Sequence, residues 1–218
     1  MVKEVKVALI NPPLLPGMFR HHPLVPLGLA YLAAVLEDAG YEVKVFDCPP
    51  LGISHEELGK MLVKFSPNFV GITCMTMTYP SAVKTAMMAK EYLSETLVGV
   101  GGPHVTFYDE EALRECPSID FVVRGEGEQT ALEIAECIRD GEKISKVHGI
   151  TLRKNGEIVR TLDRALIQDL DKLPYPAYHL FPMDKYRIFG KKIMPIITSR
   201  GCPFQCSFCV TSRMVGKK

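Results

Sequence analysis

The chain has 218 residues, enough for one large domain or for one domain and part of another. It is 47% hydrophobic and 23% charged, as globular proteins are, and its net charge of +1 gives no support for a nucleic-acid partner or an anionic membrane. No apolar run approaches the ~20 residues of a transmembrane helix, and the first residues interleave charges with apolar side chains rather than forming a secretory signal, so we expect a cytoplasmic protein.

Apolar runs alternate with helical patterns over the first 140 residues. The expected strands are residues 5–10, 42–46, 69–73, 97–100 and 120–123. The expected helices are residues 27–39, a helix opened by the capping box Ser54-His55-Glu56-Glu57, 81–93, a short helix at 109–115, and 126–139. This alternation predicts an α/β domain over residues 1–140, with a doubly wound, five-stranded, mainly parallel sheet of the Rossmann-like kind.

Ligands of parallel sheets lie at the carboxyl ends of the strands. These ends carry an unusual set of small and polar residues: Asn11, Pro12, Thr73, Thr76, Gly101, Gly102, His104, Thr106, Gly125, Glu126, Gly127 and Glu128. Glycine permits positive φ and close approach of a ligand, and threonine hydroxyls both donate and accept hydrogen bonds. These residues could line a crevice for a large, flat, amide-rich molecule. Each turn could equally be a tight strand-to-helix connection, and His104 could face a ligand or cap its loop.

Two common nucleotide sites are not expected. Gly125-Glu126-Gly127 is followed by Thr130 where the dinucleotide fingerprint has glycine, and it follows the fifth strand rather than the first. Its carboxylates would repel a pyrophosphate. The chain also has no Gly-x4-Gly-Lys-Ser/Thr motif, which excludes a P-loop.

The pattern changes after residue 140. Residues 147–153 and 157–162 alternate and are joined by Asn155-Gly156, which predicts a hairpin. Residues 169–177 contain Pro174 and Pro176 and are typical of a stiff, extended linker. We therefore expect residues 141–190 to be a hairpin and a linker. Residues 193–197 are predicted to form a single new strand that opens a third region, 191–218.

Three of the seven cysteines are clustered near the end, with the spacing C-x3-C-x2-C: Cys202, Cys206 and Cys209. Three thiolates on one loop can hold three irons of a [4Fe–4S] cube and leave the fourth iron open. A zinc site with His179 as the fourth ligand is the alternative, although structural zinc usually takes two separated cysteine pairs. The four scattered cysteines, Cys48, Cys74, Cys116 and Cys137, are expected to be small buried residues.

These motifs together resemble a known family. The cysteine loop with Gly201 and Phe208 is similar to that of radical S-adenosylmethionine (SAM) enzymes. The preceding part resembles the cobalamin-binding domain of one large class of them. This second match lies in Asn11-Pro12-Pro13, Gly101-Gly102-Pro103-His104, Arg124-Gly125-Glu126-Gly127-Glu128, the Asn-Gly hairpin and the linker prolines.

The resemblance implies cofactors and roles. Cys202, Cys206 and Cys209 would ligate a [4Fe–4S] cluster, Phe208 would lie near the adenine of SAM, and the strand-end residues would hold cobalamin. One electron, from a donor such as a ferredoxin or flavodoxin, would cleave SAM to methionine and a 5′-deoxyadenosyl radical. Methyl transfer to an unidentified small molecule or peptide would be the simplest activity.

The sequence also departs from that family pattern. The Asp-x-His-x-x-Gly loop of many cobalamin-binding domains is absent, so a histidine ligand to cobalt is not expected. A radical SAM barrel needs roughly 200 residues, and only its first strand and cluster loop are expected here. The chain would then be the N-terminal part of a longer enzyme and inactive alone. Two alternatives stay open: a radical SAM protein whose first domain binds another ligand or partner without cobalamin, and a zinc-stabilised interaction domain.

Overall fold

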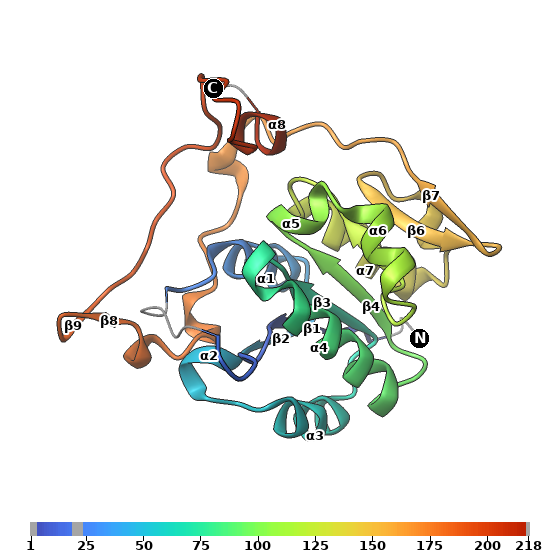
Figure 1. Cartoon of the computed structure of the whole chain (residues 1–218), viewed down its shortest axis with the longest axis horizontal. Helices are drawn as coiled ribbons and strands as arrows, with labels where there is room; N and C mark the ends of the chain where they lie inside the picture. Colours follow the sequence, from blue (N-terminus) through green and yellow to red (C-terminus); the bar gives the residue numbers. More distant parts are fainter. Residues whose placement is uncertain (1–3, 19–23, 217–218) are drawn as a thin grey trace.

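The computed structural model describes residues 4–18 and 24–216. Its centre is a seven-stranded sheet with the order β2-β1-β3-β4-β5-β6-β7 (Figure 1). The strands are β1 (Lys6–Asn11), β2 (Glu42–Asp47), β3 (Phe69–Thr73), β4 (Leu97–Gly101), β5 (Phe121–Val123), β6 (Ile150–Lys154) and β7 (Glu157–Arg160). The helices are α1 (Leu27–Asp38), α2 (Cys48–Leu51), α3 (His55–Phe65), α4 (Tyr79–Tyr92), α5 (Pro103–Thr106), α6 (Asp109–Glu115), α7 (Glu128–Asp140) and α8 (Thr211–Met214).

The first five strands are parallel, as predicted, and each lies within two residues of its expected position. The chain passes from β1 outward to β2 and then to β3, β4 and β5 on the other side of β1. The strand order therefore reverses between β1 and β3. In doubly wound sheets a ligand crevice forms beside such a switch point, at the carboxyl ends of the strands.

Helices cover both faces of the sheet, and the sheet separates two apolar layers. On one face, α1 and α7 pack on side chains such as Leu9, Phe69 and Phe121. On the other face, α3, α4 and α6 pack on side chains such as Ile10 and Ile72. Strand residues alternate between the layers because successive side chains point to opposite faces. No helix in the described part of the chain has the length and apolar character needed to cross a bilayer.

Local signals in the sequence account for two of the turns. At the start of α3, the Ser54 side chain accepts from the Glu57 backbone N–H, and the Glu57 carboxylate accepts from the Ser54 N–H, which confirms the capping box. Between β6 and β7, Asn155 and Gly156 both have positive φ, 52° and 85°. That conformation is the one a two-residue hairpin turn requires.

The predicted separation of the hairpin from the sheet domain was wrong. β6 pairs antiparallel with β5, in the register Phe121↔Leu152, so the sheet has seven strands rather than five. Ile150 and Leu152 are buried in the same layer as α7. The outer edge of β5 needs a partner for its backbone groups, and the hairpin supplies it. The expected boundary at residue 140 therefore cuts through one sheet.

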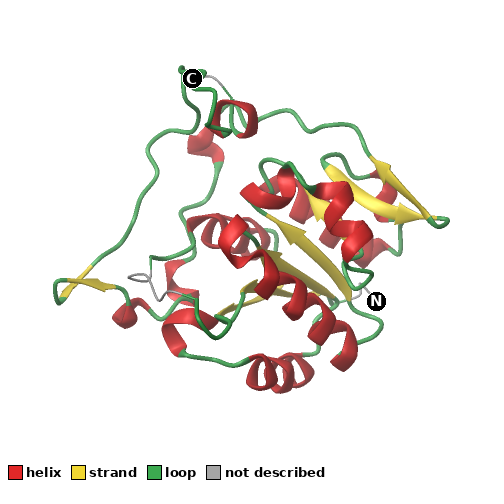
Figure 2. Ribbon diagram, in the orientation of Figure 1, coloured by secondary structure: helices red, strands yellow, loops and turns green. Residues whose placement is uncertain are grey.

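Beyond β7 the chain is mostly loop, shown in green in Figure 2. Residues 193–197, predicted as a strand, are irregular. In the described chain neither sheet places a strand beside them, so they have no ladder of backbone hydrogen bonds to join. The nearby regular structure is a small hairpin, β8 (Arg187–Ile188) and β9 (Lys191–Lys192).

Candidate functional site

The two central strands lack side chains on part of the face that α1 and α7 cover. Gly71 in β3 and Gly99 and Gly101 in β4 lie on this face because side chains alternate along a strand. A Cβ at Gly99 would lie 2.3 Å from the Phe121 ring, and one at Gly71 would lie 3.0 Å from Leu9 Cδ2. The missing side chains at Gly71 and Gly99 make room for Leu9 and the Phe121 ring, and these four residues line a space between the sheet and the helices.

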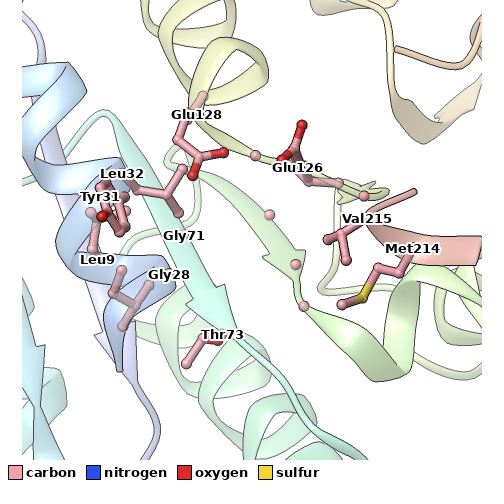
Figure 3. A pocket seen from close by; sticks show the side chains of 18 of the residues that line it. Leu9, Gly28, Tyr31, Leu32, Gly71, Thr73, Glu126, Glu128, Met214 and Val215 are labelled. Carbon is pink, nitrogen blue, oxygen red and sulfur yellow. The ribbon is translucent and has the colours of Figure 1, made fainter. Parts of the chain in front are cut away.

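The space is a cavity of about 460 Å³ at the carboxyl edge of the sheet. Gly28, Tyr31 and Leu32 of α1 form one wall, and Met214 and Val215 of the C-terminal segment lie opposite them (Figure 3). Further lining residues are Thr73, Gly101, Gly102, Gly125, Glu126, Gly127, Glu128, Ile197, Ser199, Arg200 and Gly201. The cavity is a mainly apolar slot with glycine turns at its mouth. Such a slot suits a flat group that enters it and is joined to a larger, polar group outside it.

The turn after β4 accepts only glycine at position 102. Gly102 has φ +119°, and a Cβ there would lie 2.4 Å from the carbonyl oxygen of Cys74. The Thr106 hydroxyl donates to the Gly102 carbonyl oxygen at 2.9 Å and accepts from the Gly125 N–H at 3.1 Å. Thr106, predicted as a ligand contact, therefore ties the turns after β4 and β5 together.

The two acidic residues of the β5–α7 turn are paired with one arginine. Arg200 donates to Glu126 Oε1 at 2.9 Å and to Glu128 Oε1 at 2.6 Å. All three side chains are largely buried, with 12% of Arg200 and 6% of each glutamate exposed. The single positive charge of the arginine offsets only one of the two carboxylates, so their repulsion of a phosphate ligand at this turn is reduced but not removed.

Asn11 and Pro12 lie at the end of β1, outside the lining of the cavity. The Asn11 side-chain amide donates to Asp47 Oδ1 at 2.8 Å. Burial raises the pKa of Asp47 from 3.8 to about 6, although the hydrogen bond from Asn11 opposes the shift. Pro12 is buried, and the next carbonyl, that of Pro13, accepts from the Ser81 hydroxyl.

His104 and Thr76 form a second group, away from the cavity lining. His104 Nδ1 lies 3.2 Å from Thr76 Oγ1, and the imidazole packs against the rings of both Tyr79 and Tyr108, with centroid distances of 4.6 and 5.1 Å. Both tyrosine hydroxyls donate to Glu115, at 2.7 and 2.8 Å. This packing favours the structural interpretation of His104 over a ligand contact.

The cysteine loop is accessible. Cys206 and Cys209 are exposed and Cys202 is half-buried, whereas the four scattered cysteines are buried, as expected. Hydrogen bonds from the side chain and backbone of Thr211 lower the pKa of the Cys209 thiol. Phe208 is also exposed. Three unpaired thiols on one loop are a donor set that suits an iron–sulfur cluster.

The three thiols do not converge in this structure. No group of three or more His, Cys, Asp or Glu side chains among the described residues is arranged to hold a metal ion. His179, the candidate fourth ligand of the zinc alternative, instead lies with its Nε2 3.1 Å from Glu37 Oε2.

The structure thus divides the predicted site. The members that line the cavity are Thr73, Gly101, Gly102, Gly125, Glu126, Gly127 and Glu128, whereas Asn11, Pro12, Thr76, His104 and Thr106 do not line it. Sequence reasoning missed Gly28, Tyr31, Leu32, Gly71, Gly99 and Arg200. A signal existed for two of these, since Gly71 and Gly99 interrupt otherwise apolar strands, and such glycines often mark a close ligand approach.

The fold and the slot define a cofactor-binding α/β domain joined to a cysteine loop. A comparison with protein families matches residues 20–135 to the B12 binding domain, and the chain belongs to that family. This confirms the family predicted from the strand-end motifs.

Curated relatives and solved structures agree with this assignment. The chain is 39% identical to an uncharacterised methyltransferase of Pyrococcus horikoshii and 30% identical to the cytidylyl-2-hydroxyethylphosphonate methyltransferase of Streptomyces wedmorensis. The alignments cover 100% and 98% of this chain but 48% and 49% of the relatives, so the chain spans about half their length. The fold matches the radical SAM methyltransferase TsrM of Kitasatospora setae, solved with cobalamin and a [4Fe–4S] cluster bound. That match has a TM-score of 0.75 and 22% identity, and it covers 99% of this chain and 43% of TsrM.

Proposed function

We propose that this chain binds cobalamin in the glycine-floored slot and is the cobalamin- and cluster-bearing part of a radical SAM methyltransferase. The slot is the observation that carries the proposal. Its floor excludes side chains at Gly71 and Gly99, and it opens at the carboxyl ends of β3, β4 and β5, beside the switch point between β1 and β3. Membership of the B12-binding family and similarity to methyltransferases support it.

The slot fits one part of cobalamin better than the whole. Its volume of about 460 Å³ suits a flat heteroaromatic group, such as the benzimidazole of the cofactor, rather than the entire corrin. The glycine turns at Gly101, Gly102 and Gly125 leave backbone groups accessible at the mouth. Bound cobalamin supplies the chemistry of methyl transfer. The residues of this chain would bind the cofactor, orient it and exclude water from one side.

The cysteine loop would supply the second cofactor site. Cys202, Cys206 and Cys209 would ligate a [4Fe–4S] cluster, with Phe208 beside the adenine of SAM. The cluster, when bound, supplies one-electron reduction of SAM. The electron donor would be a small redox protein such as a ferredoxin or flavodoxin, and the substrate a small molecule or peptide.

Titration with hydroxocobalamin tests the proposal. Gly28 lines the slot, and a Cβ there would meet no atom within 4 Å, so a side chain at this position enters open space. We expect the purified chain to shift the visible bands of hydroxocobalamin. Gly28→Phe should weaken binding at least roughly tenfold, or ~1.4 kcal/mol. Gly28→Ala is the matched control, because one methyl group leaves the slot open.

Two results would count against cobalamin. The absence of any band shift with the unaltered chain would favour a domain that binds another ligand or partner. Unchanged binding in Gly28→Phe, or equal weakening by Gly28→Phe and Gly28→Ala, would show that no part of the cofactor enters the slot.

A further inference from the structure

A buried ion-pair cluster joins the cysteine loop to the sheet domain. Arg200 lies two residues before Cys202, and its guanidinium donates one hydrogen bond to Glu126 and one to Glu128, 74 and 72 residues away in sequence. The Arg200 carbon Cζ also lies 5.2 Å from the centre of the Tyr31 ring, within cation–π distance. Three separate segments therefore meet at one side chain.

Both carboxylates accept hydrogen bonds from within the protein. Glu126 Oε1 and Glu128 Oε1 accept from Arg200, and Glu126 Oε2 accepts from the Ile167 N–H at 2.6 Å. Among the described residues, Arg200 is the only cation that forms an ion pair with either glutamate. Two buried carboxylates on one turn need such a partner, since an unpaired buried charge is strongly destabilising. This accounts for both glutamates without a cofactor contact.

The ion-pair cluster of Arg200, Glu126 and Glu128 lies where the cysteine loop meets the slot. Ser199, Arg200 and Gly201 line the slot on the side of the cysteine loop. The Cys202 N–H donates to the Gly216 carbonyl oxygen at 3.1 Å, which closes the loop at its base. Displacement of Arg200 would move Cys202, because only Gly201 separates them.

We propose that Arg200 is a latch, a positioning residue whose pairing with Glu126 and Glu128 holds the cysteine loop at the mouth of the slot. The role of this latch in placing a [4Fe–4S] cluster next to cobalamin rests on the proposed function. The latch itself is a property of the chain without cofactors. An arginine suits the role because its planar fork can serve two carboxylates at once, which a lysine ammonium on a flexible stem does less well.

Hydrogen exchange measured by mass spectrometry tests the latch. In Arg200→Met, which keeps an apolar stem on Tyr31 but removes the charge, we expect peptides from residues 193–216 to exchange roughly tenfold faster or more. Peptides from β1, β3 and β4 should keep their protection. Arg164→Met is the matched control, because Arg164 ties the segment after β7 to Glu133 in α7, and none of its hydrogen bonds or ion pairs in the described chain reaches residues 193–216.

A triple variant separates positioning from stability. In Arg200→Met/Glu126→Gln/Glu128→Gln, the uncompensated carboxylates are gone, so the urea midpoint should recover toward that of the unaltered chain. The fast exchange of residues 193–216 should persist, because the latch is still missing. If the urea midpoint and the slow exchange of residues 193–216 both recover, Arg200 serves only as a counter-ion for the two glutamates and does not hold the loop. Unchanged exchange in Arg200→Met would also overturn the proposal.

The outcome is independent of cofactor binding. If the unaltered chain does not bind hydroxocobalamin, the proposed function fails, but the exchange comparison still decides whether Arg200 holds the loop. If it does bind hydroxocobalamin and Arg200→Met leaves exchange unchanged, the latch alone is wrong.

Discussion

Asp47 is a carboxylic acid placed almost entirely inside the protein. It is 2% exposed, and no described residue hydrogen-bonds its Oδ2 atom. Burial raises its pKa to about 6, so the folded chain retains a proton that the unfolded chain releases near pH 4. Stability therefore falls as pH rises between about 4 and 6, by about 3 kcal/mol, and stays reduced above that range.

Asp47→Asn should remove this penalty, because the amide has no charge to bury and can still accept from Asn11. We expect the variant to gain stability relative to the unaltered chain as pH rises from 4 to 7, measured by urea unfolding. Asp163→Asn gives the opposite sign, since a hydrogen bond from Arg124 lowers the pKa of Asp163 and stabilises the fold above pH 4. Parallel pH profiles for the unaltered chain and Asp47→Asn would contradict the assignment.

Gly99 and Gly71 lie on the same face of adjacent strands but differ in what a methyl group would meet. At Gly99 the obstacle is the buried Phe121 ring at 2.3 Å, and at Gly71 it is the end of the Leu9 side chain at 3.0 Å. We expect Gly99→Ala to cost about 2 kcal/mol and Gly71→Ala less than about 1 kcal/mol. Urea unfolding measures both, and a smaller cost at Gly99 would show that the ring moves aside.

For the β6–β7 hairpin, the sequence predicts the turn but not the strand that the hairpin joins. Asn155-Gly156 predicted the turn because both residues adopt positive φ at low cost. Nothing local to residues 147–162 says which strand the hairpin joins, since that depends on the free edge of β5. The same holds for the slot: the glycines were visible, but their shared face required the register of β3 against β4.

Leu152 and Leu162 test whether the hairpin belongs to the domain. Leu152 in β6 is 5% exposed in the sheet layer, whereas Leu162 beyond β7 is 71% exposed. Leu152→Ala should cost about 3 kcal/mol of global stability, and Leu162→Ala should stay within about 0.5 kcal/mol. Circular dichroism during urea unfolding would follow the whole sheet. A minor effect of Leu152→Ala would mean that the hairpin docks without contributing to the core.

Across the whole molecule, the parallel sheet and the cysteine motif could be predicted, but their connection could not. Repeated strand–helix units specify the sheet because each is a local pattern. Arg200 meets Glu126 and Glu128 only after the chain has crossed the hairpin and the linker, and no local pattern encodes that contact. The expected strand at residues 193–197 failed for a related reason, since an apolar run forms a strand only beside a partner.

The distribution of cysteines over the whole molecule gives a prediction that needs no cofactor. Cys202, Cys206 and Cys209 are accessible, and Cys48, Cys74, Cys116 and Cys137 are buried. Burial raises the pKa of Cys74 to about 12, which keeps it an unreactive thiol, whereas Thr211 lowers that of Cys209. Under reducing conditions, we expect a maleimide to label three thiols of the native chain, Cys209 first, and all seven in urea.

Anaerobic treatment with ferrous iron and sulfide should protect the same three thiols and produce absorbance at about 400 nm. Cys202→Ala/Cys206→Ala/Cys209→Ala is the matched control, because it retains the four buried cysteines and should gain no such absorbance. Mass spectrometry of the labelled peptides assigns each site. Protection of only two thiols, or equal absorbance in the triple variant, would show that the loop does not act as one set of three ligands.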